Sequence, residues 1–538
     1  MEYGFFKYIK LSGIGEENML FDKKFIIVLL MVFLGGCGSG TSDVNTNKSS
    51  TEGEVLNVAL VTEPPTLDQP MSTASVTRDT ARLMFETLLT TDSNYQAVPV
   101  LAESIETSED GKMYTFHLRK GVLFHNGKEM VAEDVVASME RWLAVSSITG
   151  AILEGAVFEA KDDYTVTLQT TQSSPFILDA LATAKVAAAI MPKEVVEAAT
   201  PDGGVAEYIG TGPYKFVEWK QGQYIQFTKF DDYQPVEAKA DGLAGKKEAL
   251  VDDIYFYIVS DAATRLAGLR TGEYDFAYTI PFDNYDQLKN DKDLYPVFDT
   301  YGEMQLLYNE NEGLAANVKM RQAINAVLDS DMIMLSSFAD EDLYWLQPGY
   351  MTNKVSQWAS DAGSEFYNQK DPEKAKKLLE EAGYTNEEFR IITTRDYPHF
   401  YNGAIVIQEQ LKAIGMNVKL EFYDTPTLLE KQKNIGAWDA VVTGSSTVTT
   451  PSQLLALSPT FSGGMHDPTI TSLLQAIETS ETPQDAKKLW DELQGFAWEE
   501  HLPVTVLGGY NNLFGASNRV EGITTLSGPV YWNTKIKK

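Results

Sequence analysis

The chain has 538 residues, more than one hydrophobic core usually supports, so we expect two or more lobes. Its 76 acidic against 44 basic side chains give a net charge of -32, which repels phosphate backbones and argues against a nucleic-acid partner. The single cysteine excludes disulfide frameworks, cysteine-rich zinc sites and iron–sulfur clusters. The hydrophobic fraction of 43% is that of an ordinary packed protein.

An export signal lies near the N-terminus. Lys23 and Lys24 precede an uncharged apolar run at 25–34, which is too short to span a membrane as a helix. The run ends in Leu-Gly-Gly-Cys, which resembles a bacterial lipobox. We therefore expect residues 1–36 to be removed and Cys37 to become the lipidated first residue of the mature protein. The alternative is a buried structural cysteine.

The segment after the cysteine is rich in Gly, Ser, Thr and Asn, so residues 37–54 are expected to form a flexible tether. Residues 1–18 do not resemble a signal, and translation from Met19 is the expectation. The protein is then extracytoplasmic and lipid-anchored to the outer face of the cell membrane. Its acidic, long-tethered form favours a Gram-positive surface over a periplasm.

The first clear elements are two half-exposed strands, indicated by alternating apolar residues at 114–118 and 224–227. A helix follows at 371–383. Asp371 is its N-cap, a proline occupies its first turn, apolar residues repeat at helical spacing, and Gly383 ends it.

A βαβ unit comes next. A strand at 389–393, a helix striped by apolar residues at 404–414, and an alternating strand at 418–422 predict a parallel, right-handed crossover. A further short buried strand at 438–443 is expected in the same sheet. The pattern as a whole predicts an α/β fold with mixed sheets.

Several motifs, in one fixed order, resemble the extracellular solute-binding proteins of family 5, the oligopeptide, dipeptide and nickel receptors of ABC importers. The resemblance spans residues 55–535. The motifs that carry it are Leu-Ala-Glu-Ser at 101–104, the run at 110–127, Ala-Glu-Asp-Val-Val at 132–136, Gly-Thr-Gly-Pro-Tyr at 210–214, Thr-Gly-Glu-Tyr-Asp at 271–275, and the segments at 318–329, 371–384 and 408–411.

The resemblance implies a bilobed periplasmic-binding-protein-like fold with a ligand cleft between the lobes. Lobe 1 is expected at 55–300 with a C-terminal return at 505–538, and lobe 2 at 301–504. The lobes close over a peptide or other small-molecule solute, and the closed form engages an ABC permease in the membrane. A monomer without a cofactor is expected.

No catalytic motif is found in the sequence, so we expect no enzyme and no catalytic residues. The chain has five histidines. His117 and His125 belong to the motif run and are expected to be structural. His399 is the better ligand candidate by position, although a lone histidine is more often a polar loop residue. A metal cage built from protein side chains alone is not expected.

Solute in an open α/β sheet binds beyond the carboxyl ends of parallel strands, and two such ends are readable. After 389–393, Arg395 is a candidate partner for a ligand carboxylate, with Tyr397 or Tyr401 packing on the solute. The alternative is a surface pair of Arg395 and Asp396 with exposed tyrosines.

After 438–443 comes a hydroxyl-rich segment at 444–451, whose uncharged donors suit an extended or polar ligand; the alternative is a plain loop. Its candidate ligand-binding residues are Ser445, Ser446 and Thr447. Aromatic candidates for the crevice, which are alternatively core residues, are Tyr301, Trp345, Tyr350 and Tyr510. Thr73 and Ser75 lie in a stretch that borders the solute in the family.

The hydroxyl-rich segment is also where the chain departs from the family. Peptide-binding members commonly carry an aspartate here that pairs with the amino terminus of the ligand, whereas this chain has Val448. An unpaired ammonium in a closed crevice costs several kcal/mol. Either another acid such as Asp424 substitutes, or the ligand is not an ordinary free peptide.

The favoured hypothesis is a receptor that delivers a peptide or peptide-like solute to an importer. Within the same class, a receptor for a chelated metal of the nickel type, or for another non-peptide polar solute, stays open. A surface signalling or adhesive protein on the same fold is the alternative from another class. A secreted hydrolase ranks last, because no nucleophile, base and orienting group are found together.

Overall fold

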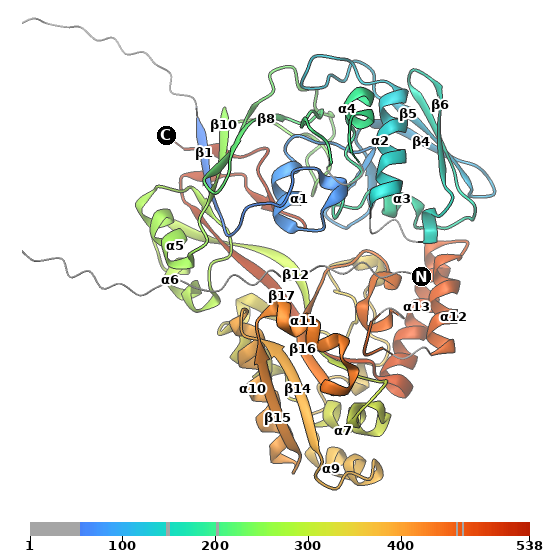
Figure 1. The fold of residues 1–538 in the computed structure, drawn as a ribbon, viewed down its shortest axis with the longest axis vertical. Coiled ribbons are helices and arrows are strands. Elements are labelled where there is room, and N and C mark those ends of the chain that lie inside the picture. The colour runs from blue at the N-terminus through green and yellow to red at the C-terminus, as the bar shows by residue number, and fades with distance from the viewer. Residues whose placement is uncertain (1–53, 147–150, 201–203, 459–460, 465–466, 538) are drawn as a thin grey trace, which may run out of the picture. The chain divides into compact units, whose positions relative to one another are not determined.

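The structure is a computed structural model that describes residues 54–146, 151–200, 204–458, 461–464 and 467–537 (Figure 1). The expected signal, Cys37, all but the last residue of the expected tether, and His466 lie outside the described residues. Within the described ranges, the helices are too short or too polar for any of them to cross a membrane.

One mixed sheet of eleven strands runs through the described part of the chain, with the order β15-β14-β16-β12-β17-β11-β1-β10-β9-β8 and with β13 paired to β17 (Figure 1). Its strands are β1 (Val55–Leu60), β8 (Tyr214–Lys220), β9 (Tyr224–Lys229), β10 (Asp253–Ile258), β11 (Phe276–Ala277), β12 (Leu294–Tyr308), β13 (Tyr344–Trp345), β14 (Glu388–Thr394), β15 (Asn417–Tyr423), β16 (Ala440–Ser446) and β17 (Val504–Ser517).

Two long antiparallel strands, β12 and β17, occupy the centre of this sheet and pair from Leu294 with Ser517 to Leu307 with Val504. On one side β12 pairs with β16, and on the other β17 pairs with β11. Figure 1 shows the two strands passing from one lobe to the other. Both lobes therefore share this pair of central strands. The bilobed α/β fold expected from the sequence is confirmed.

The predicted βαβ unit is confirmed: β14 and β15 are parallel and are joined by α10 (Pro398–Ala413). β16 joins the same sheet, as expected, and it pairs parallel to β14. It starts two residues later than predicted and continues to Ser446, so Ser445 and Ser446 are strand residues that pair with Glu303 and Gly302. The prediction of a strand end at 443 was therefore wrong.

The predicted helix at 371–383 is α9 (Pro372–Glu381). Asp371 caps it as expected, because its carboxylate accepts hydrogen bonds from the backbone N–H groups of Glu373 and Lys374. The other helices are α1 (Ser75–Ala81), α2 (Ala132–Val145), α3 (Ile177–Leu181), α4 (Lys193–Glu197), α5 (Ala262–Thr271), α6 (Tyr285–Lys289), α7 (Val318–Val327), α8 (Ser330–Phe338), α11 (Thr425–Lys433), α12 (Pro468–Glu478) and α13 (Pro483–Phe496).

A second hydrophobic core, which the sequence did not indicate, lies between residues 88 and 190. Trp142 of α2 is fully buried in it and donates a hydrogen bond from Nε1 to the Val186 carbonyl at 2.8 Å. This core packs on a separate antiparallel sheet of order β4-β5-β7-β6. The strands outside the large sheet are β2 (Leu89–Thr91), β3 (Ala97–Pro99), β4 (Ala102–Thr107), β5 (Met113–Leu118), β6 (Val157–Asp162), β7 (Thr165–Gln169), β18 (Val520–Glu521), β19 (Thr524–Thr525), β20 (Pro529–Val530) and β21 (Lys535–Ile536).

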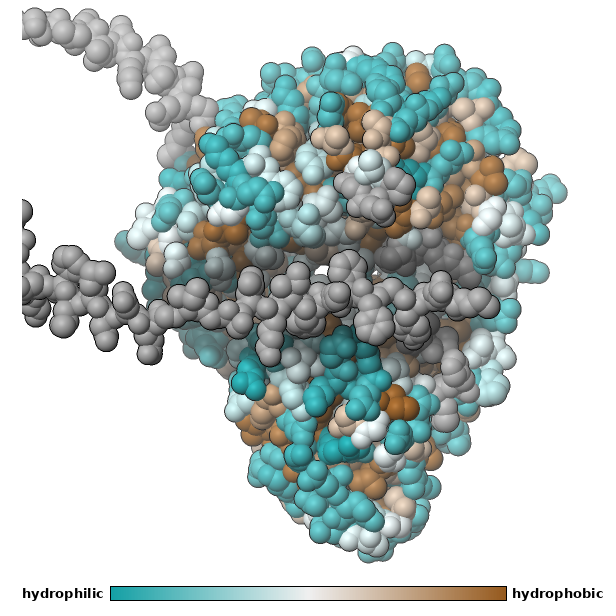
Figure 2. All heavy atoms as spheres, in the orientation of Figure 1, coloured by the Kyte–Doolittle hydropathy of each residue, from teal (hydrophilic) through white to brown (hydrophobic). Residues whose placement is uncertain are grey.

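The surface is mainly polar on the face drawn in Figure 2, where hydrophilic residues cover most of both lobes and hydrophobic residues form small separate patches. This distribution agrees with the net charge of -32.

β12 and β16 approach each other closely at Gly302. Its φ is 148°, and a Cβ at this position would lie 1.9 Å from the carbonyl oxygen of Ser445 on β16. Any side chain would push β16 away from β12, so glycine is required at the point where lobe 2 joins the shared strands.

We expect Gly302→Ala to lower the free energy of unfolding by about 1–3 kcal/mol from backbone strain alone, with the clash adding to it. Denaturant titration measures this. Gly495→Ala in α13 is the control, because its Cβ meets only the Ala362 Cβ at 3.8 Å, and alanine there is expected to be neutral or stabilising by about 0.5–1 kcal/mol. A Gly302→Ala protein as stable as the wild type would contradict this account.

The next residue on β12, Glu303, is a buried carboxyl group that accepts a hydrogen bond from Gln347 Nε2 at 3.0 Å. Burial raises the pKa of Glu303 to about 8, although the Gln347 donor opposes the shift. The folded state therefore keeps a proton that the unfolded chain releases near its ordinary pKa of 4.5, so stability falls as pH rises from about 4.5 to about 8.

Glu303→Gln removes this titration and keeps the hydrogen-bond acceptor. We expect the stability of the variant, relative to wild type, to increase between about pH 4.5 and about pH 8 by on the order of 2–4 kcal/mol, measured by chemical unfolding at several pH values. Glu373→Gln is the control, because the Glu373 side chain is 82% exposed. Identical pH profiles for Glu303→Gln and wild type would refute the assignment of a buried, protonated Glu303.

Candidate functional site

A cavity of about 590 Å³ lies where the shared strands meet segments from both sides of the sheet. Lobe 1 contributes the start of α1, the end of β2, the turn after it, the segment after α3 and the turn before β20. The crossing strands β12 and β17 and the segment after β16 complete the wall. The lining residues are Thr73, Ser75, Arg78, Thr91, Tyr95, Thr183, Ala184, Lys185, Asp299, Thr300, Tyr301, Ser446, Thr447, Val448, Thr449, Gln453, Asn512 and Ser527.

Five of the residues singled out from the sequence line this cavity together, although they come from three distant parts of the chain. They are Thr73, Ser75, Tyr301, Ser446 and Thr447. Val448, the position where the chain departs from the family that it resembles, lines it too.

The cavity floor is held by contacts between β12, β17 and the segment after β16. Tyr301 stacks on Tyr510 with ring centroids 4.9 Å apart, and Tyr510 is buried behind it. Thr447 donates to the Tyr301 carbonyl from its backbone nitrogen at 2.7 Å and from its Oγ1 at 3.1 Å. Tyr510 therefore supports the site from behind without lining the cavity.

The hydroxyl-rich wall is fixed by polar contacts farther along the segment. The backbone nitrogen of Thr449 donates to Gln453 Oε1 at 3.0 Å, and its carbonyl accepts from Trp358 Nε1 at 2.7 Å. Because these contacts use mainly backbone groups, the wall presents hydroxyls, an amide and the apolar Val448 side chain to the cavity, and no carboxylate.

The residues expected after the other strand end do not reach this cavity. Arg395 donates from Nη2 to the Phe422 carbonyl at 2.8 Å. Tyr397 is 49% exposed, and Tyr401 packs on Phe422 with ring centroids 4.4 Å apart. The expected alternative holds in part: both tyrosines are exposed, Tyr401 by 37%, but Arg395 and Asp396 form no ion pair within the described residues, and Asp396 Oδ2 accepts from the backbone nitrogen of Thr425 at 2.7 Å.

The remaining candidates also lie elsewhere. His399 is buried among aromatic rings, with the Phe400 ring centroid 4.2 Å away, and burial lowers the pKa of His399 to about 3, so the ring is neutral. Trp345 donates from Nε1 to Gln347 Oε1, and Tyr350 is buried against Trp498. Ser445 is paired in β16 and does not line the cavity.

Asp424, the acid expected to substitute for the missing aspartate, caps α11. Its Oδ1 accepts from the backbone nitrogen of Thr427 at 2.9 Å, and these hydrogen bonds hold the pKa of Asp424 below its ordinary value. It does not line the cavity. His125 is structural as expected: its Nδ1 accepts from the Gly210 nitrogen at 3.3 Å, its Nε2 lies 3.0 Å from the Gly212 carbonyl oxygen, and burial lowers its pKa to about 4.

Three charged residues that the sequence did not single out line the cavity: Arg78, Lys185 and Asp299. Arg78 pairs through Nε with Asp79 at 2.7 Å. Asp299 accepts from the backbone nitrogen of Gly528 at 3.0 Å, and burial raises the pKa of Asp299 to about 6, with nearby Arg78 opposing the shift. None belongs to a chemical motif, so no local signal marked them.

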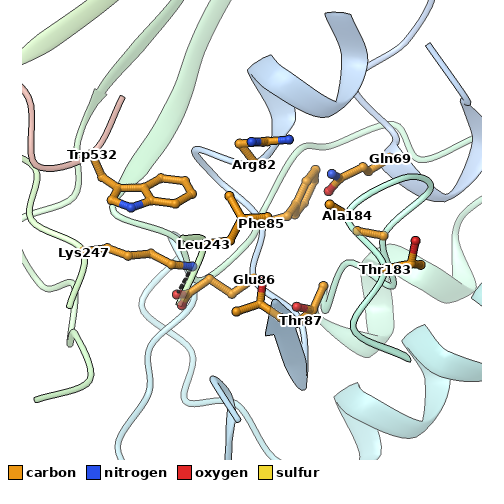
Figure 3. Close-up of a pocket in the computed structure, with 12 residues that line it drawn as sticks. Gln69, Arg82, Phe85, Glu86, Thr87, Thr183, Ala184, Leu243, Lys247 and Trp532 are labelled. Carbon is orange, nitrogen blue, oxygen red and sulfur yellow. Dashed lines mark hydrogen bonds and ion pairs between the residues drawn. The ribbon is translucent and has the colours of Figure 1, made fainter. Parts of the chain in front are cut away.

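A second, much smaller cavity of about 40 Å³ lies inside lobe 1 and has room for a few water molecules at most (Figure 3). Figure 3 shows Lys247 and Glu86 pointing toward one another, with their ion pair at 3.1 Å. Glu86 also accepts from Tyr233 and Thr211, and Lys247 lies 4.9 Å from the centre of the Trp532 ring. This buried pair is fully partnered and ties the C-terminal segment to lobe 1.

Across the described ranges, no group of three or more His, Cys, Asp or Glu side chains is arranged to hold a metal ion.

Comparison with known proteins gives one consistent result. Residues 96–466 match the family described as bacterial extracellular solute-binding proteins, family 5. The chain is 30% identical to the oligopeptide-binding protein AppA of Bacillus subtilis over 465 residues, which cover 80% of this chain and 81% of AppA. It is 27% identical to a probable peptide ABC transporter periplasmic-binding protein, y4tO, of Sinorhizobium fredii, covering 87% and 90% of the two chains.

Two solved structures agree. AgaA of A. tumefaciens R10, in complex with agropinic acid, is 28% identical with a TM-score of 0.72, covering 90% of this chain and 99% of AgaA. AppA of Bacillus subtilis, in complex with a nonapeptide, is 25% identical with a TM-score of 0.71 and the same coverage. The resemblance noted from the motifs is thereby confirmed, and this chain belongs to the bacterial extracellular solute-binding proteins of family 5.

Proposed function

We propose that this protein is the solute-binding component of an ABC importer, which captures a peptide or peptide-like small solute and delivers it to a membrane permease. The observation that carries the proposal is the cavity of about 590 Å³ enclosed by segments of both lobes around the strands that they share. A solute that contacts both walls favours the closed arrangement, and that shift in population is the signal for transport.

The chemistry of the cavity supports a polar solute of limited length. A volume of about 590 Å³ lies within the range for drug-sized ligands. Hydroxyls of Ser446, Thr447 and Thr449, with the amides of Gln453 and Asn512, offer the hydrogen bonds that a peptide backbone requires. One relative is named for oligopeptides and a structural relative was solved with agropinic acid, so both kinds of solute occur among similar proteins.

Closure has a physical basis at the far side of the cleft. Gln96 of lobe 1 donates from Nε2 to Gln357 Oε1 of lobe 2 at 3.1 Å. Beside this bond, Phe176 packs against Trp358 with ring centroids 5.2 Å apart. One hydrogen bond between side-chain amides and one ring contact contribute little free energy at this side of the cleft, so a bound solute that contacts both walls shifts the population toward closure. No catalytic step is part of this proposal.

The protein is extracytoplasmic, as its family is. We propose further that Cys37 carries the lipid anchor, that the mature chain is a monomer, and that it is held at a Gram-positive cell surface. Two acyl signals suffice for stable anchoring.

We expect Cys37→Ser to move the protein from the membrane fraction to the soluble fraction, measured by fractionation and labelling with an alkyne fatty acid. Persistent membrane association without label would refute lipidation at this residue.

The transport proposal is tested by native mass spectrometry of protein from Ser42 to Lys538 made in bacteria, followed by release of bound mass. We expect masses of short peptides or of a related small solute. An empty protein that gains mass only with a nickel chelate would refute the peptide-like solute and favour the metal-chelate receptor.

Val448→Asp is expected to restore an amine anchor. Placing a carboxylate in the hydroxyl-rich wall should raise the affinity for peptides with a free amino terminus by about tenfold or more, because a charge-assisted hydrogen bond replaces an unpaired ammonium. Calorimetric titration with free and N-acetylated peptides measures the change. Val448→Asn is the control of matched shape, and equal affinities for the Asp and Asn variants would contradict the assignment of Val448 to the ligand-facing wall.

A further inference from the structure

The charges around the cavity do not cancel. Three cations gather at its lobe 1 side, Arg78, Arg82 and Lys185, against two carboxylates, Asp79 and Asp299, which leaves an excess of one positive charge. The whole chain carries -32. A local positive excess inside so acidic a protein attracts anions into the cleft and repels cations from it.

Arg82 is fully engaged in structural contacts. It pairs with Asp79 at 3.3 Å, its Nη1 donates to the Leu526 carbonyl at 3.2 Å, and its Nη2 donates to the Ser527 carbonyl at 2.7 Å. Arg82 thus ties α1 to the turn before β20, and each of its three nitrogens already donates to a protein oxygen.

Arg78 and Lys185 differ from Arg82 in this respect. Arg78 uses Nε for its bond to Asp79, and neither of its Nη groups makes a hydrogen bond with any residue that the structure describes. The Lys185 ammonium has neither a hydrogen bond nor an ion pair within the same ranges. Two cations with free donors therefore face one cavity.

The nearby acids cannot satisfy these donors. Asp79 is shared by Arg78, Arg82 and the Tyr278 hydroxyl, which donates to it at 3.2 Å. Asp299 is buried, and the Gly528 nitrogen occupies its Oδ1. The pKa of Lys185 is lowered, first because its ammonium is partly shielded from water and second because Arg78 carries a like charge, although the residue as a whole is exposed. A bound anion would relieve the repulsion between the two cations.

The opposite wall carries no compensating acid. It consists of Ser446, Thr447, Val448 and Thr449, whose side chains are hydroxyls and an isopropyl group. An ammonium on the solute would meet no carboxylate there, at a cost of several kcal/mol in a closed cleft.

We infer that Arg78 and Lys185 form an anion subsite that holds a carboxylate of the solute, and that the solute presents no free ammonium to residues 446–449. The inference rests on the proposed function and narrows it to an anionic class: an N-blocked peptide or a comparable carboxylic acid. Arg78 binds the carboxylate through its free Nη donors, and the Lys185 ammonium, a compact charge on a flexible side chain, pairs with the same carboxylate.

The test uses pools of randomised tetrapeptides in two forms, N-acetylated with a free carboxylate and free-amine with a C-terminal amide. The full chain in mild detergent is exposed to each pool, and retained peptide is quantified by mass spectrometry. We expect retention of the acetylated acids and little retention of the amides. Lys185→Gln should lower retention of the acids by about tenfold or more, because a charge-assisted hydrogen bond is lost.

Lys185 makes no ion pair with the part of the chain that the structure describes, so Lys185→Gln is expected to unfold at the wild-type temperature, which separates a lost subsite from a lost fold. Lys292→Gln is the matched control on the outer surface, where the Lys292 side chain is 90% exposed, and it should retain the acids as wild type does.

Retention of the amides equal to that of the acids, or unchanged retention by Lys185→Gln, would overturn the anion subsite and leave the receptor function standing. Retention of no pool at all would count against the peptide-like solute itself, and the anion subsite for such a solute would fall with it.

Discussion

The pairing of β12 with β17 is the constraint on which the rest of the structure depends. These strands pair over most of their length, and each also pairs with a strand of one lobe, so one hydrogen-bonded sheet runs through both lobes. The absence of a side chain at Gly302 allows β16 to approach β12 closely. The cavity floor follows from this arrangement, because Tyr301 lies beside Gly302 and receives the hydrogen bonds of Thr447. A receptor whose lobes share strands can change the angle between its walls while the floor of its site stays intact.

The two walls of the site divide the chemistry of recognition. Lobe 1 supplies the cations Arg78 and Lys185, and Arg78 is held in place by a buried network in which Arg82 and Asp79 take the structural roles. The segment after β16 supplies hydroxyls, and backbone hydrogen bonds at Thr447 and Thr449 fix the segment in place. Charge selection and hydrogen-bond recognition therefore lie on opposite sides of the cleft, and only a solute that satisfies both walls favours closure. Such a division explains how a chain with Val448 in place of an acid keeps a specific site.

Much of the fold was predictable from local pattern, and the site was only partly so. The cap of α9 and the β14-α10-β15 unit can be predicted from the spacing of residues, because capping and amphipathic periodicity act over a few residues. Of the two strand ends at which solute was expected, the residues after β16 line the cavity and those after β14 do not, because only β16 lies next to β12. The segment at 395–401 is one strand farther from the cavity, so Arg395 folds back onto Phe422. Arg78 and Lys185 are brought together by tertiary packing alone, and no spacing in the sequence marks such a pair.

The most direct test of this account is a measurement of lobe movement on solute binding. Spin labels at Glu159 of β6 and Lys488 of α13 lie on exposed side chains of lobe 1 and lobe 2, and the chain's single cysteine, Cys37, can be replaced without touching either lobe. Pulsed electron paramagnetic resonance then gives the distance distribution with and without the solute released from the native protein. The account predicts that the solute narrows and shortens the distribution. An unchanged distribution with the solute bound would contradict the claim that binding between the lobes closes the cleft.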